Sequence, residues 1–176
     1  MSVMDLNILK EFLESNVVNT IKLQKPSDDN VEVYELVNPV VHVGWIPPKG
    51  YLPENMETNI PCLIVGFDDG SNETNNTDIN IRISAAVYSP GEHIHDEETV
   101  TFNPSFKGYI DLMNLIDRTV AELMRNPIIK DRISVIKPIK WGMYEEQPYP
   151  YWYGWIRFGI SMAPQMITQS SIQKLL

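Results

Sequence analysis

Residues 145–162 read EEQPYPYWYGWIRFGISM, and the alternation within 151–162 (YWYGWIRFGISM) decides the fold. Side chains two residues apart share one face of a β-strand. One face would carry Trp152, Ile156, Phe158, Ile160 and Met162. The other face would carry Tyr151, Tyr153, Trp155 and Arg157. The stretch therefore predicts a strand with an apolar face toward the core and an aromatic–arginine face on the other side.

The aromatic–arginine face has the composition of a protein–protein interface, where Tyr, Trp and Arg are enriched. Tyr151, Tyr153, Trp155 and Arg157 are therefore candidate partner contacts. The alternative is a face covered by the chain's own second helix, and the sequence leaves both interpretations open. A stacking platform for single-stranded nucleic acid is a third interpretation, which the net charge of −9 disfavours.

Two helices are predicted outward from this strand. Residues 104–125 place apolar side chains at three- and four-residue spacing, with Pro104 in the first turn and Asn126-Pro127 as the stop. Residues 5–20 repeat the pattern more weakly. The remaining apolar or alternating stretches predict short strands at 31–36, 40–45, 61–67, 79–88 and 132–141.

Three polar or proline-rich stretches, at 46–59, 68–78 and 89–103, are predicted as loops. The loop at 68–78 (DDGSNETNNTD) joins two strands into a long hairpin, and it carries Asp68, Asp69, Glu73 and Asp78. Together the elements predict an α+β fold. Its sheet is mostly antiparallel, with a long β-hairpin and two main helices packed on one face.

The length of 176 residues suits a single domain, 1–176, with an N-terminal helix within 1–25 and a C-terminal tail at 165–176. No apolar run reaches the ~20 residues of a membrane span, and the first residues lack the basic start of a signal peptide. We therefore expect no membrane contact and synthesis in the cytoplasm. The single cysteine, Cys62, lies in an apolar run and is expected to be a buried hydrophobe rather than a reactive thiol.

The strongest chemical candidate is the segment HIHDEE at 93–98, in which His93 and His95 are two residues apart. Such a pair, helped by a carboxylate, binds zinc or iron in some proteins. The only other histidine is His42, so an acidic, solvated loop that holds two histidines is the favoured interpretation. Nucleophile and nucleotide motifs are missing from the sequence, which predicts no enzyme and no cofactor.

The stretch from 108 to 164 resembles the tail terminator (tail completion) proteins of long-tailed bacteriophages and prophage-derived tails. The matching pieces are GYIDLMNLIDR at 108–118, NPI at 126–128, PIKW at 138–141 and EEQPYPYWYG at 145–154. PCLIVGFDDG at 61–70 also fits the family's habit of an apolar strand that enters an acidic loop. The most distinctive piece is EEQPYPYWYG.

The resemblance implies a small α/β fold without catalysis and a hexameric ring at the head-proximal end of the tail tube. Such a ring ends tube polymerisation and meets the head–tail connector or neck proteins, and the sheath where the tail contracts. The resemblance also implies that DNA passes through the lumen and that the protein lies in the neck of the virion tail, assembled in the host cytoplasm. We expect Asp68, Asp69, Glu73 and Asp78 to face the lumen or a neighbouring ring. The alternatives are another neck or head–tail connector protein, and a metal-dependent enzyme that uses His93 and His95.

Overall fold

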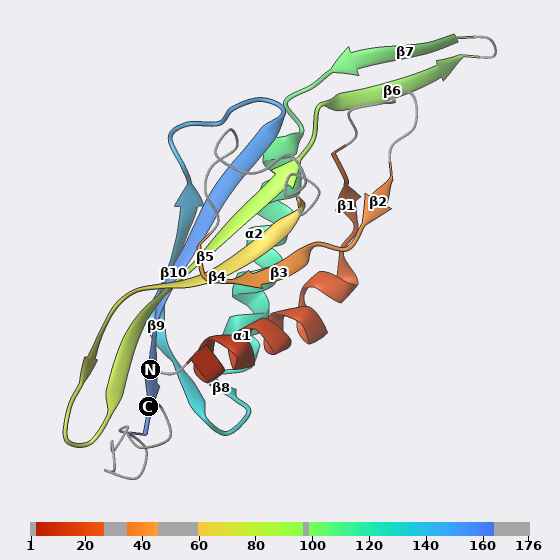
Figure 1. Cartoon of the computed structure of the whole chain (residues 1–176). Coiled ribbons are helices and arrows are strands. Elements are labelled where there is room, and N and C mark those ends of the chain that lie inside the picture. The colour runs from red at the N-terminus through yellow and green to blue at the C-terminus, as the bar shows by residue number, and fades with distance from the viewer. Residues whose placement is uncertain (1–2, 27–34, 46–59, 97–98, 164–176) are drawn as a thin grey trace, which may run out of the picture.

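The computed structural model describes residues 3–26, 35–45, 60–96 and 99–163, except for the side chains of 92–96, Val100 and Phe102. Six strands form one mixed sheet in the order β3-β4-β5-β10-β9-β8, and among the described residues two further antiparallel pairs, β1-β2 and β6-β7, are not hydrogen-bonded to it (Figure 1). All neighbours in the large sheet are antiparallel except β3 and β4. The predicted α+β fold, with a mostly antiparallel sheet, is confirmed.

The helices are α1 at Val3–Asn16, a 3-10 turn at Val18–Thr20 and α2 at Gly108–Arg125. The strands are β1 at Leu23–Gln24, β2 at Leu36–Val37, β3 at Val40–Val43, β4 at Cys62–Asn72, β5 at Thr77–Tyr88, β6 at Gly91–Asp96, β7 at Thr99–Pro104, β8 at Ile128–Ile129, β9 at Ile133–Met143 and β10 at Tyr151–Met162. Within the described residues no helix is both long and apolar enough to span a bilayer.

Strand β10 lies inside the sheet, between β5 and β9. It pairs with β5 along its whole length, from Tyr151 opposite Tyr88 to Met162 opposite Thr77. The predicted alternation is confirmed, since Ile156, Phe158, Ile160 and Met162 are buried in the core. Trp152 is only partly buried, although it packs against the same core.

Both helices cover the same face of the sheet. Helix α2 contacts β5, β9 and β10, and α1 contacts β3 and β4. The close approach of α2 depends on Gly154, because a Cβ there would lie 2.7 Å from Ile116 Cδ1 and 3.0 Å from the Gly142 carbonyl oxygen. Leu9, Leu13, Leu112, Leu115 and Ile116 are fully buried and fill the space between helices and sheet.

The predicted loop at 68–78 is wrong in its extent. Strand β4 continues to Asn72 and β5 begins at Thr77, so only a tight turn remains, closed by the Glu73 N–H, which donates to the Asn76 carbonyl oxygen at 2.8 Å. This end of the hairpin is exposed, so its residues lack the apolar alternation that burial imposes. The predicted long hairpin itself is confirmed.

The predicted loop at 89–103 is also wrong, because residues Gly91–Asp96 and Thr99–Pro104 form a two-stranded ribbon. Pro104 ends β7 opposite Gly91, and helix α2 begins later than predicted, at Gly108. The ribbon pairs with no other described strand. It therefore leaves no apolar pattern in the sequence, although Thr, Val and Phe in 99–102 favour a strand.

Smaller differences concern boundaries. The N-terminal helix breaks at Val17 into a 3-10 turn, and β9 extends two residues beyond the predicted 141. The predicted strand at 31–36 falls mostly outside the described residues, as do the loop at 46–59 and the tail at 165–176.

The close packing at Gly154 gives a testable prediction. Gly154→Ala should lower the free energy of unfolding by about 1–3 kcal/mol, because the added methyl meets both α2 and the β9 backbone. Gly159→Ala is the matched control, since its Cβ would first meet Ile136 Cβ at 3.3 Å. Urea unfolding measures both variants. Equal losses would show that the approach of α2 does not depend on Gly154.

Candidate functional site

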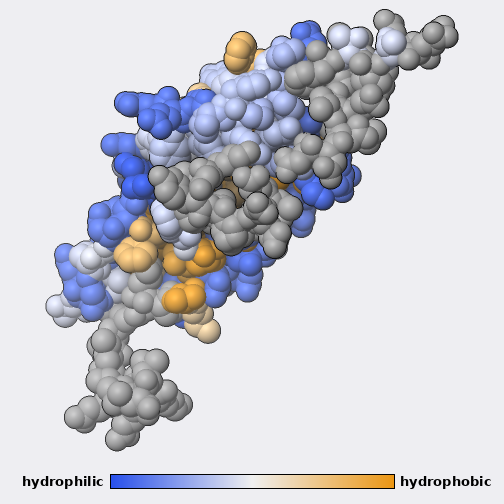
Figure 2. Space-filling model, turned by 45° about the horizontal axis from the view of Figure 1, so that its top comes forward, coloured by the Kyte–Doolittle hydropathy of each residue, from blue (hydrophilic) through white to orange (hydrophobic). Residues whose placement is uncertain are grey.

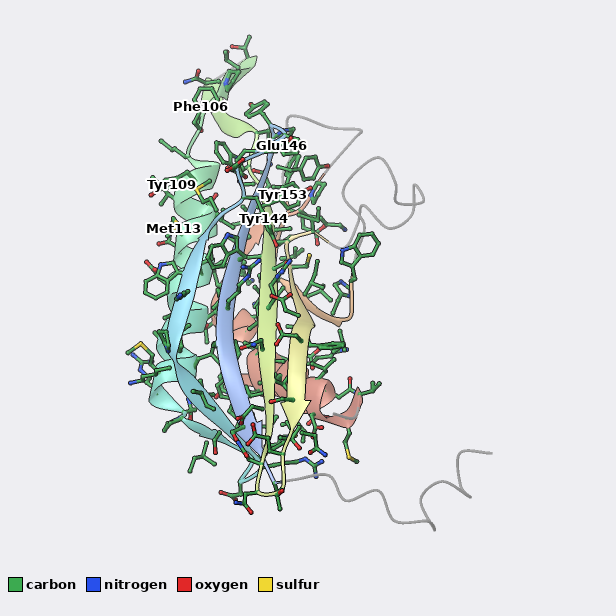
Figure 3. All side chains as sticks on the ribbon, turned by 90° about the vertical axis from the view of Figure 1, so that its left-hand side faces the viewer. Phe106, Tyr109, Met113, Tyr144, Glu146 and Tyr153 are labelled. Atoms are coloured by element: carbon green, nitrogen blue, oxygen red, sulfur yellow. The ribbon has the colours of Figure 1, made fainter. Side chains whose placement is uncertain are left out.

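The face of the sheet opposite the helices is the candidate site, and we call it the open face. In Figure 3 the strands lie in front of α1, and Tyr144 and Tyr153 lie near one end of the sheet beside the start of α2. Alternation along the paired strands assigns the following residues to the open face: Asp68 on β4, Arg82 and Ser84 on β5, Lys140 and Gly142 on β9, and Tyr153, Trp155 and Arg157 on β10.

A row of positive charge crosses the open face. Arg157 lies opposite Arg82 on one side and opposite Lys140 on the other. Like charges placed opposite each other on neighbouring strands are destabilising. Asp68 offsets this repulsion through an ion pair with Arg82 at 2.7 Å and a longer one with Arg157 at 3.6 Å.

The structure thus brings together residues that the sequence placed in separate groups. Asp68, expected on an acidic loop, contacts Arg157 of the aromatic–arginine face. The Arg157 guanidinium also lies 5.0 Å from the centre of the Trp155 ring, a cation–π distance. Trp155 in turn lies across Gly142, where a Cβ would be 3.0 Å from its Cζ2 atom. The predicted aromatic surface therefore extends to β9.

Tyr151 is not at the surface, although it was predicted with Tyr153, Trp155 and Arg157 as a partner contact. Its side chain is 3% exposed, and its ring lies 5.2 Å from that of Tyr88. Tyr153 and Trp155 are partly exposed and Arg157 is exposed. Of the four predicted contacts, these three have exposed surface.

The other predicted acidic residues lie at the far end of the β4–β5 hairpin. Asp69 accepts a hydrogen bond from Asn80 Nδ2 at 2.6 Å, and Asp78 accepts one from Asn76 Nδ2 at 2.7 Å. Glu73 belongs to the turn itself. The carboxylates of Asp69 and Asp78 thus form hydrogen bonds within the hairpin. The expectation that they face a lumen stays a prediction.

The ribbon formed by β6 and β7 projects from one end of the sheet (Figure 1). His93 and His95 lie on β6, where their backbones are opposite Phe102 and Val100, and their side chains are outside the description. The described residues contain no group of three or more His, Cys, Asp or Glu side chains able to hold a metal.

An aromatic cluster holds the base of this ribbon, and the sequence did not predict it. Phe106 makes edge contacts with Tyr149 and Trp152, at ring distances of 6.0 and 6.4 Å. The Tyr149 hydroxyl donates to the Pro90 carbonyl oxygen, and Trp152 Nε1 donates to that of Ser89 at 3.4 Å. The many aromatic residues in 145–155 indicated that this segment makes extensive contacts. They did not indicate that its partners would be the distant residues Ser89 and Pro90.

Burial shifts the pKa values of two potentially reactive side chains, Cys62 and His42, in the direction that favours their neutral forms. Burial raises the pKa of the Cys62 thiol to about 12, which confirms the expected inert, buried cysteine. Burial, helped by the charge of Lys10, lowers the pKa of His42, and its Nε2 atom has no hydrogen-bond partner among the described residues. His42 is therefore neutral at pH 7.

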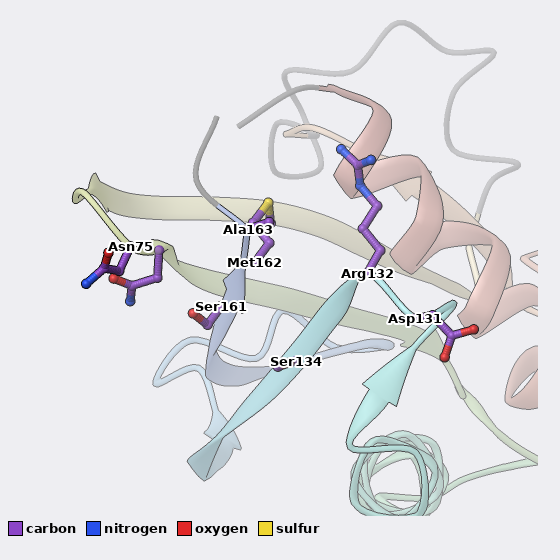
Figure 4. Close-up of a pocket in the computed structure, with 8 residues that line it drawn as sticks. Asn75, Asp131, Arg132, Ser134, Ser161, Met162 and Ala163 are labelled. Atoms are coloured by element: carbon purple, nitrogen blue, oxygen red, sulfur yellow. The ribbon is translucent and has the colours of Figure 1, made fainter. Parts of the chain in front are cut away.

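A polar cavity of about 550 Å³ lies at the opposite end of the sheet from the ribbon (Figure 4). Its lining combines the hairpin turn, the start of β9 and the end of β10: Asn75, Asn76, Asp131, Arg132, Ser134, Ser161, Met162 and Ala163. Arg132 Nε also donates to the buried Asp5 at 2.8 Å. The charged side chains of this lining are Asp131 and Arg132, and it contains no histidine or cysteine.

Comparison with known protein families and with curated proteins finds no match for this chain.

The ribbon base gives a second prediction. Trp152→Ala should speed amide hydrogen exchange in β6 and β7, because it removes the Phe106 contact and the hydrogen bond to Ser89. Tyr149→Phe, which removes one hydroxyl, should cost about 1 kcal/mol and change exchange less. Hydrogen-exchange mass spectrometry compares the two. Unchanged exchange in both variants would show that the cluster does not hold the ribbon.

The lowered pKa of His42 gives a third testable prediction. The pKa is lower in the folded chain than its unfolded value of about 6.5, so protons favour the unfolded state. This contribution to stability is fully present above about pH 6.5 and is lost as the pH falls through the folded pKa. Chemical unfolding between pH 7.5 and 5.5 should show a shallower pH dependence for His42→Asn than for the unaltered chain. An identical pH dependence of stability in the two chains would show that His42 does not contribute to it.

Proposed function

We propose that this chain is a non-catalytic structural subunit of a long-tailed phage tail, a tail terminator. Its copies form a ring at the head-proximal end of the tube, end tube growth and present the surface for head joining. The observation that carries the proposal is the β6–β7 ribbon, whose strands pair only with each other within the described part of the chain. An element held firmly at its base and unpaired along its length is suited to contact other molecules.

The distinctive block EEQPYPYWYG supports the same role, since it is the most specific part of the resemblance to tail terminators. Tyr149 and Trp152 of this block hold the ribbon base, and Tyr153 begins the exposed part of the open face. The block therefore connects two surfaces suited to partners. This gives the resemblance a physical basis in assembly rather than in catalysis.

The charge distribution is compatible with a ring through which DNA passes. The net charge is −9, and Asp69, Glu73 and Asp78 gather at one end of the β4–β5 hairpin. Negative groups that face a lumen would repel the phosphates and let DNA move without binding. In this proposal the hexameric ring contacts the tube protein, the head–tail connector or neck proteins and, in a contractile tail, the sheath.

The proposal predicts the phenotype of particles that lack this protein. Electron microscopy should show overlong tubes or tails without heads, because nothing caps the tube or receives the head. Restoring the unaltered gene in trans is the control. Tails of normal length that lack heads would favour a connector protein, and normal joined virions would contradict both roles.

A further inference from the structure

Two stretches at opposite edges of the large sheet are left without a neighbouring strand. Strand β3 pairs with β4 only from Cys62 to Val65. Strand β8 pairs with β9 only at Ile133 and Ser134. Among the described residues, no strand covers the outer side of β4 from Gly66 or of β9 from Ile136 onward. Such uncovered edges are ready templates for pairing with another chain.

The outward backbone groups of both edges can be assigned from their hydrogen bonds. Val65 accepts from Gly44 on the outer side of β4, and outward groups recur at every second residue, so those of Phe67 also point outward. The Tyr144 N–H donates inward to the Tyr153 carbonyl oxygen, so the groups of Trp141 point outward from β9. Each edge thus offers one N–H and one C=O at an aromatic residue.

The side chains of Phe67 and Trp141 are also alike, since both are aromatic and lie on the same face of the sheet. Phe67 lies beside Ile81 and Trp141 beside Ile156, both on the helix-covered face. They are exposed nonetheless, Phe67 by 53% and Trp141 by 46%. In the view of Figure 2 the coloured surface is mostly hydrophilic, with hydrophobic residues in a few separate patches. Pairing with another strand at these edges would bury part of this aromatic surface.

The next residue on each edge is charged, with opposite sign. Asp68 lies on the open face of β4, and Lys140 lies on the open face of β9, opposite Arg157. Lys140 forms no ion pair among the described residues. On the other side of the aromatic positions both strands carry a glycine, Gly66 and Gly142. Cross-strand pairs of opposite charge and of aromatic residues stabilise antiparallel sheets.

We propose that β4 of one copy pairs antiparallel with β9 of the next, with Phe67 opposite Trp141, Asp68 opposite Lys140 and Gly66 opposite Gly142. This register alone satisfies backbone direction, face and charge together. The matched stretch is short, residues 66–68 against residues 140–142, because the β4–β5 register shifts at Asp68 and the β9–β10 register shifts opposite Phe158. The partner is a second copy of this chain, because both complementary edges belong to one sheet.

The strand directions fit a ring. In the order β4-β5-β10-β9 every neighbour is antiparallel, so β4 and β9 of one chain run in opposite directions. Copies related by rotation about an axis along the strands keep these directions, so β9 of one copy meets β4 of the next in the antiparallel sense. The contact joins two different surfaces, and such head-to-tail contacts form a ring when the rotation between copies closes on itself. The inference rests on the proposed function, and it names the surfaces through which the ring closes.

Disulfide trapping tests the register directly. Opposite residues of a hydrogen-bonded antiparallel pair have Cα atoms ~5.5 Å apart, within the range that disulfides span. The double variant Phe67→Cys/Trp141→Cys should form covalent multimers on mild oxidation, whereas each single variant should form none. Cys62 should not compete, because it is buried and its thiol pKa is about 12. Native mass spectrometry of the unaltered chain shows whether copies associate under the same conditions.

Charge reversal provides an independent test with a matched control. Lys140→Glu should weaken self-association by about three- to tenfold per contact, because it places like charges opposite each other. Lys137→Glu changes the net charge equally but lies outside the matched stretch, so its effect should be smaller. Equal weakening by both variants would show that overall charge, rather than this pairing, governs association.

Other outcomes separate this inference from the proposed function. Self-association of the unaltered chain without trapping in the double variant would overturn the edge pairing and leave the tail role standing. Covalent dimers of a single variant would indicate a two-fold contact and also overturn it. A chain that stays monomeric at its highest soluble concentration overturns the edge pairing as well, and electron microscopy of particles then decides the tail role by itself.

Discussion

The pairing of β10 with β5 is the interaction on which the rest of the structure depends. It joins the two halves of the chain along twelve residue pairs, from Tyr151–Tyr88 to Met162–Thr77. Because side chains alternate, this register places Ile156 and Phe158 under the helices and Trp155 and Arg157 on the open face. A slip by one residue would exchange the two faces and bury a guanidinium among aliphatic side chains. The core and the candidate interface are thus set together.

Burial explains which elements could be predicted from the sequence. Strands β5 and β10 and helix α2 bury one side, so their apolar residues recur with the strand or helix period. Residues 67–75 of the β4–β5 hairpin are exposed, and the β6–β7 ribbon joins no larger sheet among the described residues, so the polar composition of both was mistaken for loops. The start of α2 was missed because Pro104 suits both a first helical turn and the end of an edge strand.

The candidate site was only partly predictable for a different reason. Alternation names the residues that share a face, and it correctly separated Trp155 and Arg157 from the core. It does not say what covers a residue, so the burial of Tyr151 against Tyr88 was missed. Contacts between distant segments, such as Asp68 with Arg157 or Trp152 with Ser89, depend on the register of whole strands, which no local pattern contains.

The position of β10 in the chain has a consequence for synthesis. Its partner β5 is made early, and the ribbon, α2 and β9 all leave the ribosome before β10 does. Until then Ile79, Ile81 and Ile83 have a strand on only one side, and α2 lacks the strand that carries Gly154. Long-range pairing of this kind makes folding slow and leaves apolar surface exposed in the nascent chain. An incomplete polypeptide therefore lacks the finished sheet, and only chains translated through β10 can complete the core and the open face together.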